Sequence, residues 1–160
     1  MNKKKLNKGI GLVEVLVAVF IFTIILSSLI LISNLYLSGS TDSLRNTQAA
    51  YLAEEGIEGV KIIRDNSWDD ILSILSNTQK FLYFSSASST WQVSDTKEEI
   101  GVFSRSFIIN SVSRDSDGDI SVSGTDDPNT KKVTVNVSWN GKKGVVTKSL
   151  ITYITNIVGE

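Results

Sequence analysis

Glu14 is the clearest candidate for a chemical role. It is the one charged side chain in the apolar run at positions 10–32, IGLVEVLVAVFIFTIILSSLILI. A carboxylate near the end of an apolar helix costs about 2–3 kcal/mol on insertion scales, and less where it reaches the headgroups. A positively charged partner would offset that cost, so we interpret Glu14 as half of an ion pair. The alternative is a plain membrane anchor whose glutamate extends to the headgroups.

A second group of carboxylates lies in the segment Asp115-Ser116-Asp117-Gly118-Asp119. Oxygen ligands at alternate positions suit a hard cation such as calcium. No glutamate falls at the twelfth position of an EF-hand loop, and Asp, Ser and Gly are ordinary turn residues. We therefore favour a solvated turn and predict no metal site, with calcium binding as the open alternative. The segment 125–129 is a second acidic turn that could add a ligand or begin a strand.

The composition excludes several classes of site. With no histidine and no cysteine, the chain has no imidazole or thiolate metal ligand, disulfide, cysteine nucleophile or Ser-His-Asp triad. Enzymes can act through paired carboxylates, but no pair here lies in the apolar surroundings that tune such groups. The net charge of −1 argues against nucleic-acid binding, which requires a basic surplus. We predict neither an enzyme nor a cofactor.

The apolar run predicts the element that positions Glu14 in a membrane. A helix over residues 10–32 would be about 35 Å long, against a hydrocarbon core of about 30 Å. A cleaved secretory signal has a shorter apolar region of about 7–15 residues. Residues 1–9 carry four lysines and no acid, so the positive-inside rule keeps the N-terminus cytoplasmic. The chain after residue 32 should lie on the other side of the membrane.

The start of this run resembles the leader and first mature residues of type IV pilins and type II secretion pseudopilins, in the segment Lys8-Gly9-Ile10-Gly11-Leu12-Val13-Glu14-Val15-Leu16-Val17-Ala18. In that family a short basic leader ends in glycine, and a glutamate follows as the fifth mature residue of an unbroken apolar helix. The resemblance implies prepilin peptidase cleavage between Gly9 and Ile10, and N-methylation of the new Ile10 amine. The sequence departs from the family at Ile10 and Gly11, where Phe or Met and then Thr are usual.

The same resemblance implies a role in assembly and a location. The Ile10 amine of one subunit would face Glu14 of its neighbour when the helices stack. The implied partners are other pilin or pseudopilin subunits through the N-terminal helix, the prepilin peptidase, the inner-membrane assembly platform, and membrane lipid before assembly. The implied location is the bacterial inner membrane, with a single pass and a cytoplasmic N-terminus, followed by an extracytoplasmic or cell-surface filament.

The helix should continue beyond the membrane through residues 33–66. Its first part, 33–43, is rich in Ser, Thr and Gly, and helical periodicity then resumes. The apolar face comprises Ala49, Leu52, Ala53, Gly56, Val60 and Ile63. Two glycines lower helix propensity, so they either permit close packing or are tolerated faults: Gly56 and Gly59. An acidic cluster on the polar face is interpreted as solvated, with partner binding as the alternative: Glu54, Glu55 and Glu58.

From residue 67 the pattern changes to a globular head. Ser67 should cap a short helix over 68–75. Alternating apolar and polar residues predict strands at 80–85, 90–94, 102–113, 131–140 and 144–156. The last two should form a hairpin through Asn140-Gly141-Lys142-Lys143, with its apolar face on the helix. The predicted fold class is α+β and type IV pilin-like, with a long N-terminal helix, half transmembrane and half docked on the head, packed against a C-terminal antiparallel sheet.

The predicted division is a removable leader at 1–9, a transmembrane and assembly helix at 10–32, the distal half of the helix at 33–66, and a head at 67–160. The implied function is a structural subunit of a type IV pilus or type II secretion pseudopilus. The distal helix and the tail are most similar to PilV-like minor pilins or minor pseudopilins. The alternatives are a membrane-tethered extracytoplasmic binding module that does not polymerise, which leaves the spacing from glycine to glutamate unexplained, and a secreted hydrolase.

Overall fold

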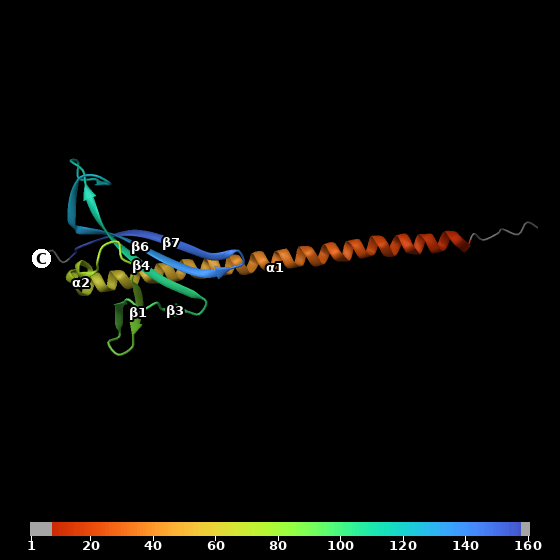
Figure 1. The fold of residues 1–160 in the computed structure, drawn as a ribbon, viewed down its shortest axis with the longest axis horizontal. Helices are drawn as coiled ribbons and strands as arrows, with labels where there is room; N and C mark the ends of the chain where they lie inside the picture. Colours follow the sequence, from red (N-terminus) through yellow and green to blue (C-terminus); the bar gives the residue numbers. More distant parts are fainter. Residues whose placement is uncertain (1–7, 158–160) are drawn as a thin grey trace, which may run out of the picture. The chain divides into compact units, whose positions relative to one another are not determined.

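The computed structural model describes residues 8–157 of the chain, with side chains from residue 11 onward. The chain divides into two compact units, Met1–Leu44 and Arg45–Glu160, which we call the N-terminal unit and the C-terminal unit. Helix α1 (Lys8–Asn66) contributes to both units and is labelled in Figure 1. The first seven residues of the expected leader lie outside the described residues. The predicted division at positions 9, 32 and 66 stays a prediction.

Helix α1 continues without a break through the segment 33–43, which is rich in Ser, Thr and Gly. The hydroxyl of Thr41 donates to the carbonyl oxygen of Leu37 at 3.0 Å, one turn back, so its hydrogen bond stays within the helix. A Cβ added to Gly39 would meet no atom within 4 Å. This part of α1 is therefore continuous despite its unfavourable composition.

Helix α2 (Trp68–Ser73) begins at the predicted cap, because Ser67 Oγ accepts a hydrogen bond from the backbone N–H of Asp70 at 3.3 Å. The predicted end at residue 75 was two residues too late. Ile74 is already extended, with φ −76° and ψ 119°. The N–H of Asn77 then donates to the carbonyl oxygen of Ile109 at 2.8 Å, which draws the chain onto the sheet instead of extending the helix.

The described strands of the C-terminal unit form two antiparallel sheets. Strand β1 (Phe81–Ser85) pairs with β2 (Thr90–Ser94) in the smaller sheet. The larger sheet has the order β3-β4-β6-β7, and β5 pairs with β4 outside this path. Its strands are β3 (Glu99–Ile100), β4 (Phe103–Arg114), β5 (Ile120–Ser121), β6 (Thr125–Gly141) and β7 (Gly144–Thr155). The predicted α+β class is confirmed, and the arrangement is consistent with a type IV pilin-like fold.

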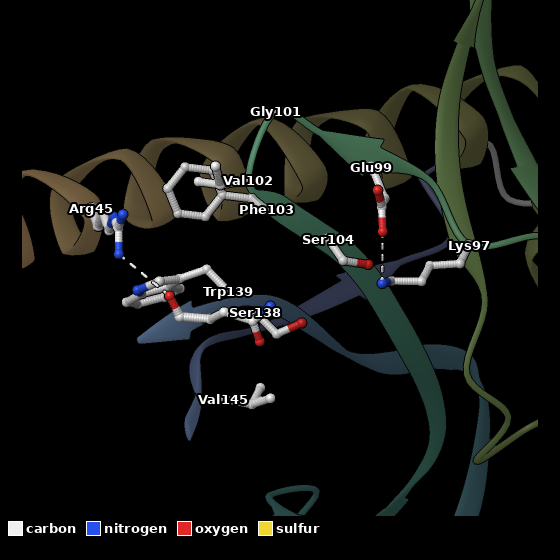
Figure 2. Close-up of a pocket in the computed structure, with 11 residues that line it drawn as sticks. Arg45, Lys97, Glu99, Gly101, Val102, Phe103, Ser104, Ser138, Trp139 and Val145 are labelled. Atoms are coloured by element: carbon white, nitrogen blue, oxygen red, sulfur yellow. Dashed lines mark hydrogen bonds and ion pairs between the residues drawn. The ribbon is translucent and has the colours of Figure 1, made fainter. Parts of the chain in front are cut away.

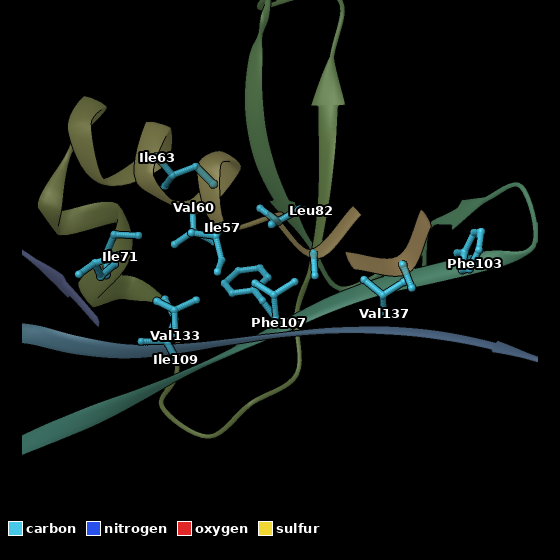
Figure 3. Packing of buried hydrophobic residues seen from close by; sticks show 14 of the residues in the cluster. Ile57, Val60, Ile63, Ile71, Leu82, Phe103, Phe107, Ile109, Val133 and Val137 are labelled. Atoms are coloured by element: carbon cyan, nitrogen blue, oxygen red, sulfur yellow. The ribbon is translucent and has the colours of Figure 1, made fainter. Parts of the chain in front are cut away.

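The core of the C-terminal unit lies between α1 and the larger sheet (Figure 3). The predicted apolar face of the helix supplies Ala49, Ala53, Val60 and Ile63, all buried, whereas Leu52 is half-buried. The sheet contributes alternate residues of two neighbouring strands to this core, since successive side chains of a strand point to opposite faces. These residues are Phe103, Phe107 and Ile109 on β4 and Val133, Val135 and Val137 on β6. The predicted packing of hairpin on helix is confirmed at β6.

Two glycines bring the backbone of α1 close to the sheets. A Cβ at Gly56 would lie 2.9 Å from Val135 Cγ1 and 3.0 Å from Arg105 Cδ. A Cβ at Gly59 would lie 3.0 Å from Cδ2 of the Trp91 ring. Of the two interpretations of these glycines, close packing is therefore the one that the structure supports.

Strand β6 begins six residues before its predicted start at Lys131. The pairing of β4 with β6 shifts between Ser111 and Val112, whose partners are Lys131 and Asp127. The residues in between include Pro128, which has no N–H to donate and so fits at a bulge. Strands β3 and β5 were not predicted, because two-residue strands have no readable alternation.

Candidate functional site

The N-terminal unit presents an apolar helical surface that nothing in the described chain covers. Every described residue from 11 to 32 is exposed, and its large apolar side chains range from 44% exposed at Leu26 to 68% at Leu12. The best 18-residue window of the helix has a mean hydropathy of 3.1. An apolar surface of this extent marks contact with lipid or with other protein. By length and composition, this helix could cross a membrane.

The hydroxyl groups within this apolar helix have their hydrogen bonds made locally. Thr23 Oγ1 donates to the carbonyl oxygen of Phe20 at 2.7 Å. Ser27 Oγ donates to that of Thr23 at 2.8 Å, and Ser28 Oγ donates to that of Ile24 at 2.8 Å. A polar group without a partner is costly in hydrocarbon. These side chains therefore suit an apolar environment, a property that the hydropathy of the sequence alone does not reveal.

Glu14 is the charged residue of the apolar helix, and it lies exposed in the first turns of α1. The backbone of Gly9 and Ile10 also belongs to α1, although their side-chain surroundings lie outside the described residues. Four residues of helix separate Ile10 from Glu14, which corresponds to a rise of about 6 Å. A free amine at Ile10 and the carboxylate of Glu14 would therefore form two opposite charges about one turn apart along the helix.

The carboxylates considered as calcium ligands form a turn between β4 and β5. Asp115 Oδ1 accepts hydrogen bonds from the N–H groups of Asp117 and Asp119, both at 3.0 Å. The carboxylate thus closes the turn, as aspartates commonly do. Within residues 8–157 no group of three or more carboxylates is placed to hold a metal ion. The absence of a metal site at this turn stays a prediction.

Arg114 links this turn to the start of β6. Its Nε donates to Asp127 Oδ2 at 2.6 Å, and its Nη1 donates to the carbonyl oxygen of Gly118 at 2.8 Å. Its Nη2 donates to Thr130 Oγ1 at 3.2 Å. The hydrogen bond from Arg114 is the main cause of a lowered pKa at Asp127, and Thr130 adds to it. The acidic segment 125–129 is therefore tied into the sheet.

We expect the Asp127→Asn substitution to destabilise the C-terminal unit near neutral pH but not in acid. Because the pKa of Asp127 is lowered from 3.8 on folding, its contribution is present above that value and is lost as the pH falls through the folded pKa. The melting temperatures of the variant and the unmodified chain, measured from pH 6 to pH 2, should therefore converge. Asp126→Asn is the control, and a gap of constant size across this range would contradict the prediction.

Arg105 is a buried cation that the sequence analysis did not predict. Its side chain is 2% exposed and lies on the helix-facing side of β4 among apolar residues. Its Nη1 donates to Glu55 Oε2 at 2.9 Å and to the carbonyl oxygen of Leu52 at 3.2 Å. Its guanidinium also lies 4.9 Å from the centre of the Trp91 ring. Glu55, read from the sequence as a solvated acid, is therefore partly engaged inside its own unit.

A cavity of about 440 Å³ opens at the end of the larger sheet (Figure 2). Its charged side chains already have partners: Arg45 Nη1 donates to the carbonyl oxygen of Asn140 at 3.3 Å, and Lys97 Nζ lies 3.1 Å from Glu99 Oε1. The Phe103 and Trp139 rings meet edge to face, 5.7 Å apart. The lining contains one carboxylate and therefore no pair for acid–base catalysis.

Residues 4–30 match the family described as the prokaryotic N-terminal methylation motif. The chain carries the prepilin signal of type IV pilins and pseudopilins. Proteins with this signal form a structural rather than an enzymatic family. No curated protein and no solved structure matches the chain.

The prepilin signal covers the residues that the sequence singled out. Gly9, Ile10 and Glu14 all fall within the matched range, together with most of the apolar helix. The match and the geometry thus concern the same segment, the exposed apolar part of α1.

Proposed function

We propose that this chain is a structural subunit of a type IV pilus or type II secretion pseudopilus. Prepilin peptidase cleaves it between Gly9 and Ile10, and it assembles through its N-terminal helix. The exposed apolar surface of α1, with one carboxylate near its start, carries this proposal. Such a surface needs lipid before assembly and neighbouring helices afterwards, since water is unfavourable for it in both states.

Glu14 recruits a neighbouring subunit in this proposal. Cleavage frees the Ile10 amine, which is then N-methylated, and the amine of one subunit pairs with Glu14 of the next. Each charge loses water on assembly, so an ion pair with the correct register is much more favourable than either charge alone. The membrane-tethered module that does not polymerise needs neither the cut nor the pair.

The orientation follows from the leader. Its four lysines keep the N-terminus in the cytoplasm, which places the C-terminal unit outside the inner membrane. Removal of residues 1–9 leaves 12 basic and 17 acidic side chains. The assembly platform of the inner membrane then transfers the subunit from lipid into an extracytoplasmic or cell-surface filament.

A Gly9→Val variant should retain the leader, because a β-branched side chain replaces the small residue at the proposed cut. The measurement is N-terminal sequencing of the protein from cells with an active prepilin peptidase, where the unmodified chain should begin at N-methylated Ile10. Gly11→Val is the matched control and should still yield Ile10 as the first residue. An unmodified chain that begins at Met1 in those cells would reject the proposed function.

A further inference from the structure

Strand β7 is an open edge of the larger sheet. It pairs with β6, and its other side has no strand partner within the described part of the chain. Val145, Ile151 and Tyr153 are 71%, 53% and 46% exposed, and their even spacing places them on one face of the strand. Natural sheets usually protect an open edge of this length. An edge that instead exposes several large apolar residues is suited to binding another protein surface.

The charge of this edge identifies the kind of partner. The hairpin at residues 129–157 carries five lysines and no acidic residue. Two of them, Lys142 and Lys143, form the exposed turn between β6 and β7. Residues 45–128 carry seven basic and fourteen acidic side chains, so charge is strongly segregated within the C-terminal unit. The hairpin therefore favours a partner whose surface is both acidic and partly apolar.

The chain itself has a surface of that description on α1. Five exposed residues follow one another at steps of three or four and so form one stripe: Tyr51, Glu54, Glu58, Ile62 and Asp65. Tyr51 is 67% exposed and Ile62 is 41% exposed. At about 100° per residue, the stripe lies opposite the buried face that contains Ala53 and Val60. Because that buried face packs on the sheet, the stripe points away from β7 of the same chain.

We infer that the β7 edge of one copy, with its Lys142-Lys143 turn, docks on the outer α1 stripe of a second copy. The hairpin is basic, whereas the stripe carries three acids, of which Glu58 and Asp65 also pair with Lys61 and Arg64 of the same helix. Both surfaces expose apolar side chains, and their positions within one chain prevent them from meeting there. Contact between two different surfaces of identical subunits repeats from copy to copy, and it builds an open filament when the rotation between copies does not close a ring. The inference rests on the proposed function and adds to it the surfaces through which C-terminal units meet.

Reciprocal charge reversal tests the inference on the full-length chain in detergent. The K142E/K143E and E54K/E58K variants should each weaken self-association by roughly tenfold, measured by sedimentation at low salt. The chain with all four reversals should regain it, because the two surfaces remain complementary. Added salt should weaken the unmodified chain's association, since exposed charges are screened within about 10 Å at 0.1 M. The D117K/D119K variant carries the same charge change as E54K/E58K, on the turn between β4 and β5, and should associate normally.

Crosslinking tests the contact itself, and the absence of cysteine from the chain makes single-cysteine variants clean reporters. A Tyr51→Cys copy mixed with a Val145→Cys copy should give a mixed dimer with a short thiol crosslinker. In the control mixture Val122→Cys replaces Val145→Cys, because Val122 is fully exposed outside β7. Equal yields from the two mixtures would overturn the inference, as would failure of the fourfold reversal to restore association.

Two further outcomes separate this inference from others. If K142E/K143E self-associates normally but loses binding to vesicles of anionic phospholipid, the basic hairpin contacts lipid and the inference fails. N-terminal sequencing and the yield of sheared filaments are recorded for the same variants. Filaments that begin at Ile10 but give no enriched crosslink would reject the docking surface and leave the proposed function intact. A chain that keeps its leader and still gives the enriched crosslink would reject the proposed function and leave the docking surface intact.

Discussion

A Glu14→Ala variant should be cleaved and held in the membrane but absent from filaments. The cut lies four residues before Glu14, and the remaining helix stays apolar enough to span the bilayer. In a filament, however, the Ile10 amine of the neighbouring subunit would lose its partner. Removal of one member of a buried ion pair costs about 3–5 kcal/mol, which corresponds to a loss of incorporation of at least about 100-fold.

The yield of the variant in sheared filaments, relative to the membrane fraction, measures this effect. Glu99→Ala is the matched control, because Glu99 is an exposed glutamate of the C-terminal unit. The control should enter filaments normally, and both variants should begin at Ile10. Normal incorporation of Glu14→Ala would remove Glu14 from the assembly mechanism, whereas a failure of cleavage would assign it to processing instead.

A Gly56→Leu variant should strongly destabilise the C-terminal unit. The first added carbon would already lie 2.9 Å from Val135 and 3.0 Å from Arg105, both of which are buried. The remaining atoms would have to separate α1 from the sheet, and overpacking of this kind costs about 1–3 kcal/mol or more. The higher helix propensity of leucine offsets only about 0.8 kcal/mol. We expect the melting temperature to fall on the order of 10 °C.

Gly39→Leu supplies the comparison, since a side chain at Gly39 meets nothing within 4 Å. The same substitution in the same helix should leave the melting temperature unchanged or slightly raised. Thermal unfolding of the full-length chain, followed by the near-ultraviolet signal of its tryptophans, measures both. Equal melting temperatures for the two variants would show that close approach at Gly56 does not limit stability.

The elements with strong periodicity were predictable from the sequence. The buried face of α1 could be read at steps of three and four, and it packs on the alternating valines of β6. The cap at Ser67 also follows from local chemistry. The hairpin of β6 and β7 was also predicted, but its turn was placed one residue too early. Gly141 pairs with Gly144, so Lys142 and Lys143 form the turn.

Contacts between distant segments were not predictable. Arg105 occupies a core position of β4, where a sequence pattern would place an apolar residue, because Glu55 and Trp91 complete its surroundings from elsewhere in the chain. The bulge opposite Ser111 depends on the pairing of β4 with β6, which no single segment specifies. At the candidate assembly site the situation is reversed. Gly9, Ile10 and Glu14 form a local signal, so the sequence alone is enough to propose them.

The hydroxyls of Thr23, Ser27 and Ser28 bear on how easily α1 can move between lipid and a bundle of helices. Each is bonded to its own backbone one turn earlier, so none depends on a neighbouring helix. Transfer of α1 from acyl chains to a bundle of helices would then break no hydrogen bond of these groups. Transfer from the bundle back to the acyl chains would likewise break none. In a filament built on such helices, these three hydroxyls would therefore neither favour nor oppose the return of a subunit to the bilayer.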